Sequence, residues 1–165
     1  SCDGGSNPPG PFVDVSRAKL DAALAATLAD SREVAFPDKT RFEALRFRHV
    51  AGLGIEGRAR FYDPETGTYP PPDIEFFGSV PMGWWRVKEG ALTVKLATVD
   101  GIEPIPGGAA STSQVAERIR DSLSTGVGDL LSRMSFPTGL DPTRRWIIAS
   151  GQSTPTALRF ELWQR

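Results

Sequence analysis

Few residues in this chain have the types and spacing that catalysis requires. The single histidine, His49, follows Leu45 and Phe47 in an alternating pattern, and one imidazole cannot form a zinc site without carboxylate or thiolate ligands. No Gly-x-Ser-x-Gly segment is present to expose a serine nucleophile. We therefore interpret His49 as a partly exposed strand residue. We predict no catalytic residue, no metal site, no cofactor and no enzymatic activity.

One glycine-rich segment, Gly52-Leu53-Gly54-Ile55-Glu56-Gly57, has the spacing of a dinucleotide-binding loop. Such a loop requires a strand before it and a helix after it, whose N-terminus meets the pyrophosphate. Here apolar and polar residues alternate over residues 53–62, which predicts a strand after the first glycine. The glycines therefore indicate sharp coiling, a bulge or a turn, and not a nucleotide site.

Asp63 and Glu65 come closest to a paired-carboxylate site. They lie in the segment Asp63-Pro64-Glu65-Thr66-Gly67, where proline and glycine favour a tight turn. The pair lacks the regular oxygen-ligand spacing of a calcium-binding loop. We interpret it as a solvated hairpin loop.

The charge balance excludes other classes of function. The chain has 19 Lys and Arg against 20 Asp and Glu, so it lacks the basic excess that binding to nucleic acid requires. Arg46, Arg48, Arg58 and Arg60 occupy alternate strand positions, which is typical of a solvated sheet face, although a basic stripe that meets anionic lipid headgroups or a partner is the alternative. No run of about 18 apolar residues is present to span a bilayer.

The elements begin with a helix over about residues 16–29. Ser16 can cap it, and Leu20, Leu24 and Leu28 form a narrow apolar stripe. From residue 34 to residue 96 the apolar period changes to two, which indicates strands. The clearest are residues 53–62, 74–80, and a hairpin that joins residues 85–87 to residues 92–96.

The second half of the chain combines a long helix with a final strand. Apolar residues at helical spacing predict a helix over about residues 113–134, and Gly126 and Gly128 inside it indicate a bend or a close approach to another segment. Residues 141–149 fit either a helix or a strand, and the alternation over residues 158–163 predicts a last strand. The order predicts the α+β class, with an antiparallel sheet packed on one long and one shorter helix.

The N-terminal segment differs in composition from the rest of the chain. Cys2 is the only cysteine, and Gly, Pro, Ser, Asn and Asp make up residues 3–11. These residue types bury too little apolar area to offset the entropy of ordering, so we expect a flexible tether over residues 1–11 and a single domain over residues 12–165. The segment resembles the start of a mature bacterial lipoprotein, in which the cysteine is acylated. That resemblance implies an anchored protein of the cell envelope that faces the periplasm; a free thiol at the edge of a truncated domain is the alternative.

The order of elements resembles the YceB-like family of small bacterial envelope lipoproteins. The resemblance includes the short first helix, the meander, the strand Gly90-Ala91-Leu92-Thr93-Val94 followed by Val99 and Ile102, the amphipathic helix and the last strand. It implies one strongly curved antiparallel sheet that wraps around the long helix. By analogy, an apolar groove between helix and sheet would hold a lipid or another hydrophobic ligand.

Two hypotheses for function follow. In the first, a non-enzymatic, membrane-anchored module binds a hydrophobic ligand in a groove lined by Phe47, Ile55, Phe61, Phe76, Trp85, Leu92, Val94, Ile119, Leu123 and Val127. In the second, an envelope adaptor binds a protein through an edge strand or through the outward aromatics Phe77, Trp84 and Trp163. Trp84 is included because adjacent strand residues point to opposite faces, so Trp84 and Trp85 cannot both enter one core. The alternative is that a helix or loop covers the second face.

Overall fold

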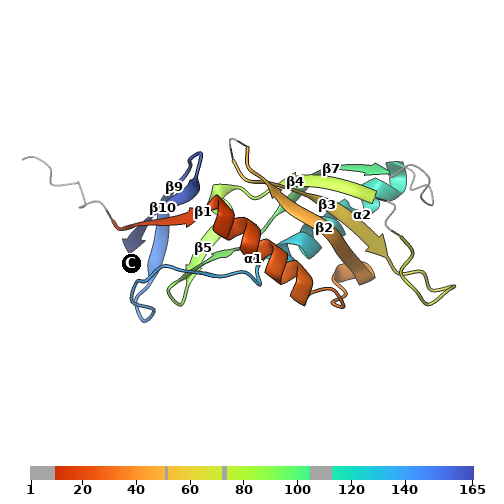
Figure 1. The fold of residues 1–165 in the computed structure, drawn as a ribbon, viewed down its shortest axis with the longest axis horizontal. Coiled ribbons are helices and arrows are strands. Elements are labelled where there is room, and N and C mark those ends of the chain that lie inside the picture. Colours follow the sequence, from red (N-terminus) through yellow and green to blue (C-terminus); the bar gives the residue numbers. More distant parts are fainter. Residues whose placement is uncertain (1–9, 51, 72–73, 105–112) are drawn as a thin grey trace, which may run out of the picture.

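The computed structural model describes residues 10–50, 52–71, 74–104 and 113–165, and no side chain is described at residues 38, 104 and 113–118. The described residues form two α-helices, two short 3-10 helices and ten strands in three antiparallel sheets. The helices are α1 (Arg17–Asp30), η1 (Pro37–Lys39), η2 (Met82–Trp84) and α2 (Ser113–Leu131). The molecule is elongated, with the N- and C-terminal strands together at one end (Figure 1). The predicted α+β class is confirmed.

The terminal sheet joins the two ends of the described chain. Its strand order is β1-β10-β9, formed by β1 (Phe12–Ser16), β9 (Trp146–Ser153) and β10 (Ala157–Gln164). Phe12 pairs with Glu161 and Ser16 with Ala157, while Trp163 pairs with Ile147 on the other side of β10. Strand β10 is therefore central, and its Leu158, Phe160 and Leu162 are fully buried.

The four-stranded sheet has the order β2-β3-β4-β7. It consists of β2 (Thr40–Arg48), β3 (Gly54–Phe61), β4 (Ile74–Ser79) and β7 (Thr98–Pro104). A bulge interrupts the pairing of β2 with β3 between Glu43 and Arg46, and Ala44 has a φ of 53° there. A Cβ atom on Gly57 would lie 2.8 Å from Leu45 Cδ1, so this glycine makes room for the bulged strand.

The hairpin sheet contains β5 (Trp85–Lys88), β6 (Ala91–Val94) and the short β8 (Phe136–Pro137). Glu89 and Gly90 connect β5 to β6 with φ values of 52° and 75°, the backbone that a tight two-residue hairpin requires. The predicted hairpin is confirmed.

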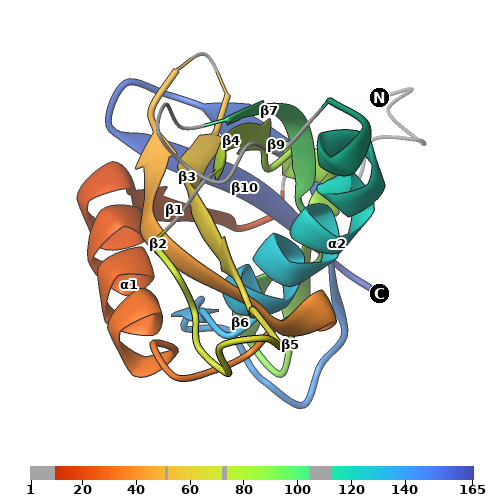
Figure 2. The ribbon, with the colours of Figure 1, turned by 90° about the vertical axis from the view of Figure 1, so that its right-hand side faces the viewer.

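The two α-helices pack beside opposite edge strands of the four-stranded sheet. The hydroxyl of Ser16 accepts a hydrogen bond of 3.1 Å from the Lys19 amide, which caps α1 as predicted. Helix α1 buries Leu20 and Leu24 and packs on β2, whereas α2 packs on β7. Figure 2 shows α1 and α2 on opposite sides of β2 and β3.

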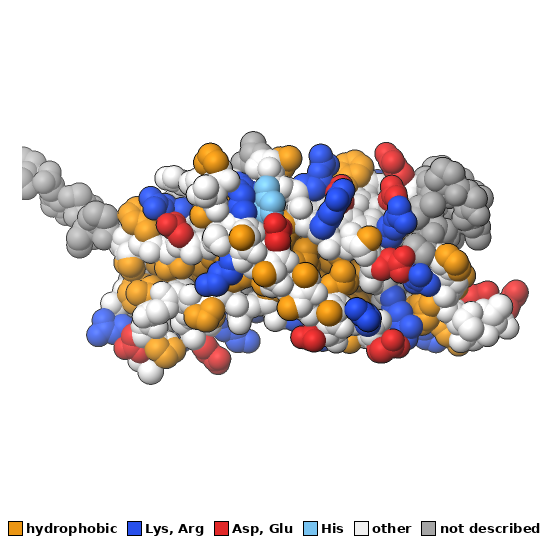
Figure 3. Space-filling model, viewed as in Figure 1, with side chains coloured by type: hydrophobic (Ala, Val, Ile, Leu, Met, Phe, Trp, Pro, Cys, Tyr) orange, Lys and Arg blue, Asp and Glu red, His pale blue; other side chains and the backbone are white. Residues whose placement is uncertain are grey.

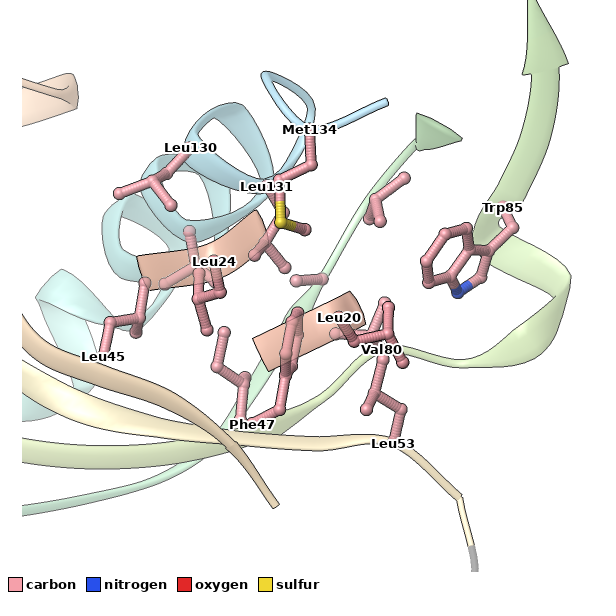
Figure 4. Packing of buried hydrophobic residues seen from close by; sticks show 14 of the residues in the cluster. Leu20, Leu24, Leu45, Phe47, Leu53, Val80, Trp85, Leu130, Leu131 and Met134 are labelled. Atoms are coloured by element: carbon pink, nitrogen blue, oxygen red, sulfur yellow. The ribbon is translucent and has the colours of Figure 1, made fainter. Parts of the chain in front are cut away.

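One buried apolar cluster connects all three sheets and both helices. Trp85 of the hairpin sheet lies 5.2 Å from Phe160 of the terminal sheet and 5.9 Å from Phe136, measured between ring centroids. Phe42 of β2 contacts Phe76 of β4 at 5.8 Å. Figure 4 shows side chains of α1, α2 and β2 converging, with Trp85 pointing from β5 towards them. A single core thus holds the described elements together.

Several predicted details differ from the structure. The expected single sheet is divided into three, because β6 pairs with β5 and β8, whereas β10 pairs with β1 and β9. Residues 146–153 form a strand, and helix α2 ends at Leu131 and not at residue 134. Strands β1 and β8 are not evident in the sequence, since each is short and pairs with a segment far along the chain. The Pro11 carbonyl accepts a 2.9 Å hydrogen bond from the Leu162 amide, while residues 1–9, Cys2 among them, lie outside the described residues.

Candidate binding surfaces

All ten residues expected to line a groove belong to the buried apolar cluster. Eight of them are at most 6% exposed, and Phe61 and Ile119 are partly buried at its margin. They come from six elements, namely β2, β3, β4, β5, β6 and α2. The structure therefore brings the predicted set together, and it packs these side chains against one another. That they form a ligand groove stays a prediction.

A cavity lies between β5 and β9. It has a volume of about 330 Å³ and is lined by Met82, Gly83, Trp85, Arg86, Val87, Trp146, Ile147 and Ile148. We call it the β5–β9 cavity. Trp85, which is 4% exposed, connects it to the buried cluster, and its indole N–H has no acceptor among the described residues. Of the ten predicted groove residues, Trp85 is the one that lines this cavity.

The outer face of the four-stranded sheet carries the four arginines singled out from the sequence. Each has a glutamate partner: Arg46 and Arg48 share Glu56, Arg58 lies 3.0 Å from Glu75, and Arg60 lies 2.6 Å from Glu43. Acidic and basic side chains intermingle on the surface in Figure 3. Because opposite charges neutralise each other across the strands, the interpretation of a solvated sheet face fits better than a basic stripe.

Phe77 lies on the same outer face. It pairs with Gly101 of β7, and a Cβ atom on Gly101 would overlap the Phe77 ring. The aromatic ring therefore covers the glycine backbone, yet 43% of Phe77 stays exposed.

His49 occupies a junction between α1, β2 and β9. Arg17 donates from Nη1 to His49 Nδ1 at 2.9 Å, so the other ring nitrogen, Nε2, donates to Asp21 at 2.7 Å. Arg17 also donates to the Ser153 hydroxyl and to the Thr154 carbonyl. Ser153 thus bonds to Arg17 and not to the imidazole, so the serine, histidine and aspartate do not form a catalytic relay. The sequence did not reveal this junction, because its members are far apart along the chain.

The turn with Asp63 and Glu65 is a local structure, as expected. The Asp63 carboxylate accepts a 2.9 Å hydrogen bond from the Glu65 amide, and Asp63 forms a bridge with Thr68. Among the described residues, no group of three or more His, Cys, Asp and Glu side chains is placed to hold a metal ion. Neither α1 nor the described part of α2 is both long and apolar enough to cross a bilayer.

The three residues expected to form a partner surface lie on separate elements. Phe77 is in β4, Trp163 is in β10 and 42% exposed, and Trp84 is the half-buried last residue of η2. Trp84 was expected in a strand and is in a 3-10 helix, but the expectation that only one of Trp84 and Trp85 enters the core is confirmed. The three residues do not share one sheet face.

A different group of exposed apolar residues lies on the terminal sheet. Phe12, Ile147 and Trp163 are 52%, 40% and 42% exposed. Trp163 pairs directly with Ile147, and Phe12 pairs with Glu161, two residues before Trp163 on the same face of β10. We call these three residues the terminal patch. Sequence reasoning found Trp163 but missed Phe12 and Ile147, because strand β1 was unexpected and the helix-or-strand choice at residues 141–149 was open.

No family model matches this sequence, and no curated protein matches it. Among solved structures, the chain is similar to a crystal structure of lipopolysaccharide binding protein, with a TM-score of 0.31 and 9% sequence identity. The match covers 96% of this chain and 51% of the other, so this chain spans about half the length of that protein.

Proposed function

We propose that this protein is a non-enzymatic, membrane-anchored lipoprotein of the bacterial envelope that binds a lipid or another hydrophobic ligand. In this proposal, acylated Cys2 anchors the chain and the β5–β9 cavity admits the ligand. The cavity is the observation that carries the proposal.

Most of the residues that line the cavity are of hydrophobic types. Six of its eight residues are hydrophobic, and its volume of about 330 Å³ lies within the range of small-molecule sites, roughly 300–1,000 Å³. A ligand there would cover part of Ile147, which is 40% exposed. Each Å² of apolar surface removed from water contributes roughly 25 cal/mol, so such a ligand needs few polar contacts. The Trp85 indole N–H is buried beside the cavity and lacks an acceptor among the described residues.

The predicted groove residues form the inner extension of this site. Trp85 lies in the cavity wall and also in the buried cluster that includes Leu92, Val94, Leu123 and Val127. A longer acyl chain would reach them by separating α2 from the strands. The YceB-like resemblance, which implies a ligand between helix and sheet, agrees with this route and stays a prediction.

Native mass spectrometry of the 165-residue chain, isolated from a bacterial membrane extract, tests the proposal. We expect an additional mass in the lipid range that is lost when the protein unfolds. Gly83→Trp should abolish it, because Gly83 lines the cavity and has open space around its Cβ position. Gly52→Trp is the matched control: this glycine also has open space, but it lines a different cavity, beside Leu53 and Pro81.

Two results would contradict ligand binding in the β5–β9 cavity. One is a mass without ligand, even after incubation with envelope lipids. The other is an additional mass that both tryptophan variants keep, which would place the ligand elsewhere.

A protein adaptor is the second candidate, and the exposed Phe77 favours it. This ring is 43% exposed on an otherwise charged sheet face, where an aromatic side chain can anchor a partner. A photoreactive phenylalanine analogue at position 77 should then form one discrete covalent adduct in cells. The same analogue at Val50, which is 53% exposed, should form none. Equal labelling from both positions would argue against an adaptor surface at Phe77.

A further inference from the structure

We propose that the terminal patch docks on an anionic lipid bilayer, with Phe12, Ile147 and Trp163 inserted at the level of the headgroups. This inference rests on the proposed membrane anchor at Cys2 and deepens it, because it names the face that the folded domain turns towards the bilayer. The chemical partner is a membrane surface rich in anionic lipid.

The patch gathers half of the strongly exposed large hydrophobic residues in the described part of the chain. The other three are Val50, Phe77 and Leu96, which lie in or beside the four-stranded sheet. Phe12, Trp163 and Ile147 come from three neighbouring strands. Trp163 pairs directly with Ile147, and Phe12, which pairs with Glu161, lies diagonally across from Trp163 on the same sheet face. Insertion of these three side chains into the headgroup region removes apolar area from water at three neighbouring positions.

The patch has the polar features of an interfacial site. The Trp163 indole donates a 3.1 Å hydrogen bond to the Glu161 carboxylate, and the Arg159 guanidinium lies 5.5 Å from the centre of the Phe12 ring. Arg159 in turn is held by Asp14. Aromatic side chains that also contact a polar group are typical of the membrane–water interface, because one side of this interface is apolar and the other is hydrated.

Basic residues lie beside the patch. A surface concavity at the same end of the terminal sheet is lined by Ile147 and by Lys88, Arg144, Arg145 and Arg165, against Glu89 as its acidic residue. Asp141, 3.4 Å from Arg144, adds one more carboxylate nearby. With Arg159, Asp14 and Glu161 of the patch included, five basic side chains stand against four acidic ones, a small basic excess that complements an anionic headgroup layer.

The segment that connects the folded domain to Cys2 begins beside the terminal patch. The Pro11 carbonyl bonds to Leu162, and a Cβ atom on Gly10 would lie 2.9 Å from Trp163 Cδ1. Gly10 is eight positions after Cys2, a span of at most about 28 Å when fully extended. An acyl chain on Cys2 therefore holds the terminal patch within reach of the bilayer.

To test this proposal, the chain is coupled to vesicles by a reaction that does not require acylation in a cell. Because Cys2 is the only cysteine, a maleimide-headgroup lipid couples the 165-residue chain at one site. The vesicles contain phosphatidylcholine, phosphatidylglycerol and a lipid with bromine atoms near the headgroup end of its acyl chains. We expect quenching of tryptophan emission, and the quenched component should disappear in Trp163→Phe.

A second arm uses the uncoupled chain and measures sedimentation with the same vesicles. Replacement of both Phe12 and Trp163 by serine should weaken binding by about tenfold or more. Phe77→Ser is the matched control, since Phe77 is 43% exposed and Trp163 is 42% exposed, and it should bind as the unaltered chain does. Binding to vesicles of phosphatidylcholine alone should be weaker and less sensitive to salt.

Emission from Trp163 that brominated lipid does not quench in the coupled protein would overturn the proposal. So would a loss of binding in Phe77→Ser equal to that in the double variant. Equal binding to neutral and anionic vesicles would overturn the choice of an anionic surface. These outcomes leave acylation of Cys2 untouched, because the maleimide lipid supplies the anchor; failure of acylation in cells would show in fatty-acid labelling and leave the vesicle results standing.

Discussion

Asp14 and Arg159 are 145 residues apart in the sequence and form a two-point ion pair across β1 and β10. Arg159 donates from Nε to one carboxylate oxygen at 2.8 Å and from Nη2 to the other at 3.1 Å. The two residues are also direct partners in the strand register. The pair therefore marks the point at which the beginning of the described chain is held against its end.

This pair should be visible in the pH dependence of one carboxylate. The hydrogen bond from Arg159, with its positive charge, lowers the pKa of Asp14 below 3.8. A lowered pKa in the folded state means that the stabilisation is present above the unfolded value and is lost as the pH falls through the folded value, here below about pH 4. We expect a small effect, because both side chains are 48% exposed and solvent screens the pair.

Carboxyl titration by NMR measures this pKa. In Arg159→Gln the pKa of Asp14 should return towards 3.8. The pKa of Asp141 is lowered by hydrogen bonds from Thr143, and it should stay low in this variant. An Asp14 pKa that is unchanged in Arg159→Gln would mean that the pair does not persist in solution.

Two glycines of α2 should respond in opposite ways to the same substitution. A Cβ atom on Gly126 would lie 2.8 Å from Phe42 Cζ, inside the core, whereas the nearest atom to one on Gly128 is Ala97 N at 3.5 Å. Gly126→Ala should therefore destabilise the fold by about 1–3 kcal/mol through overpacking. Gly128→Ala should stabilise it by about 0.5–1 kcal/mol, because alanine has the lower entropy cost in a helix.

Urea unfolding of both variants gives the free energies of unfolding. If both substitutions stabilise the protein, α2 does not approach β2 as closely as the structure has it.

Arg17 should contribute to stability by joining three segments. Its side chain donates to the Thr154 carbonyl, the Ser153 hydroxyl and His49 Nδ1. Arg17→Met should lower the free energy of unfolding by about 1–2 kcal/mol, because these hydrogen bonds are lost while the aliphatic part of the side chain is retained. Chemical denaturation monitored by tryptophan fluorescence measures the change.

Lys19→Met, an exposed residue of the same helix, is the control and should change stability by less than about 0.5 kcal/mol. Equal effects of the two substitutions would show that the hydrogen bonds of Arg17 make no specific contribution to the free energy of unfolding.

The proposed anchor makes a simple biochemical prediction. When the gene is expressed in bacteria with its native upstream sequence, an alkyne-labelled fatty acid should be incorporated into the protein, and the protein should sediment with the membranes. Cys2→Ser should lose both the label and the sedimentation, because no second cysteine can replace it. A protein without label in the soluble fraction would exclude a lipid anchor at Cys2.

Local patterns in the sequence predicted a large part of the fold. The alternation over residues 53–62 and 158–163, and the turn at Glu89-Gly90, identified β3, β10 and the β5–β6 hairpin, since a strand that buries one face must alternate. The cap at Ser16 and the leucine stripe likewise placed α1. The same patterns grouped the ten apolar residues that the structure packs into one cluster.

The candidate surfaces were predicted only in part. Trp85 was assigned to the ligand site, but Met82 and Trp146 join it in the cavity wall only because β5 and η2 lie beside β9. Trp163 was expected to point outwards, and its neighbours Phe12 and Ile147 follow from the pairing of three strands. No spacing within a short segment encodes such neighbours.

The sequence by itself therefore determined which residues alternate, which cap or turn, and which must leave water, because these properties depend on neighbours a few positions away. The tertiary structure alone decided that the strands divide into three sheets, that Asp14 meets Arg159, that Arg17 bonds to both Ser153 and His49, and that the exposed aromatics of the terminal sheet share one face. These are contacts between distant segments, and they depend on how the whole chain packs its one core.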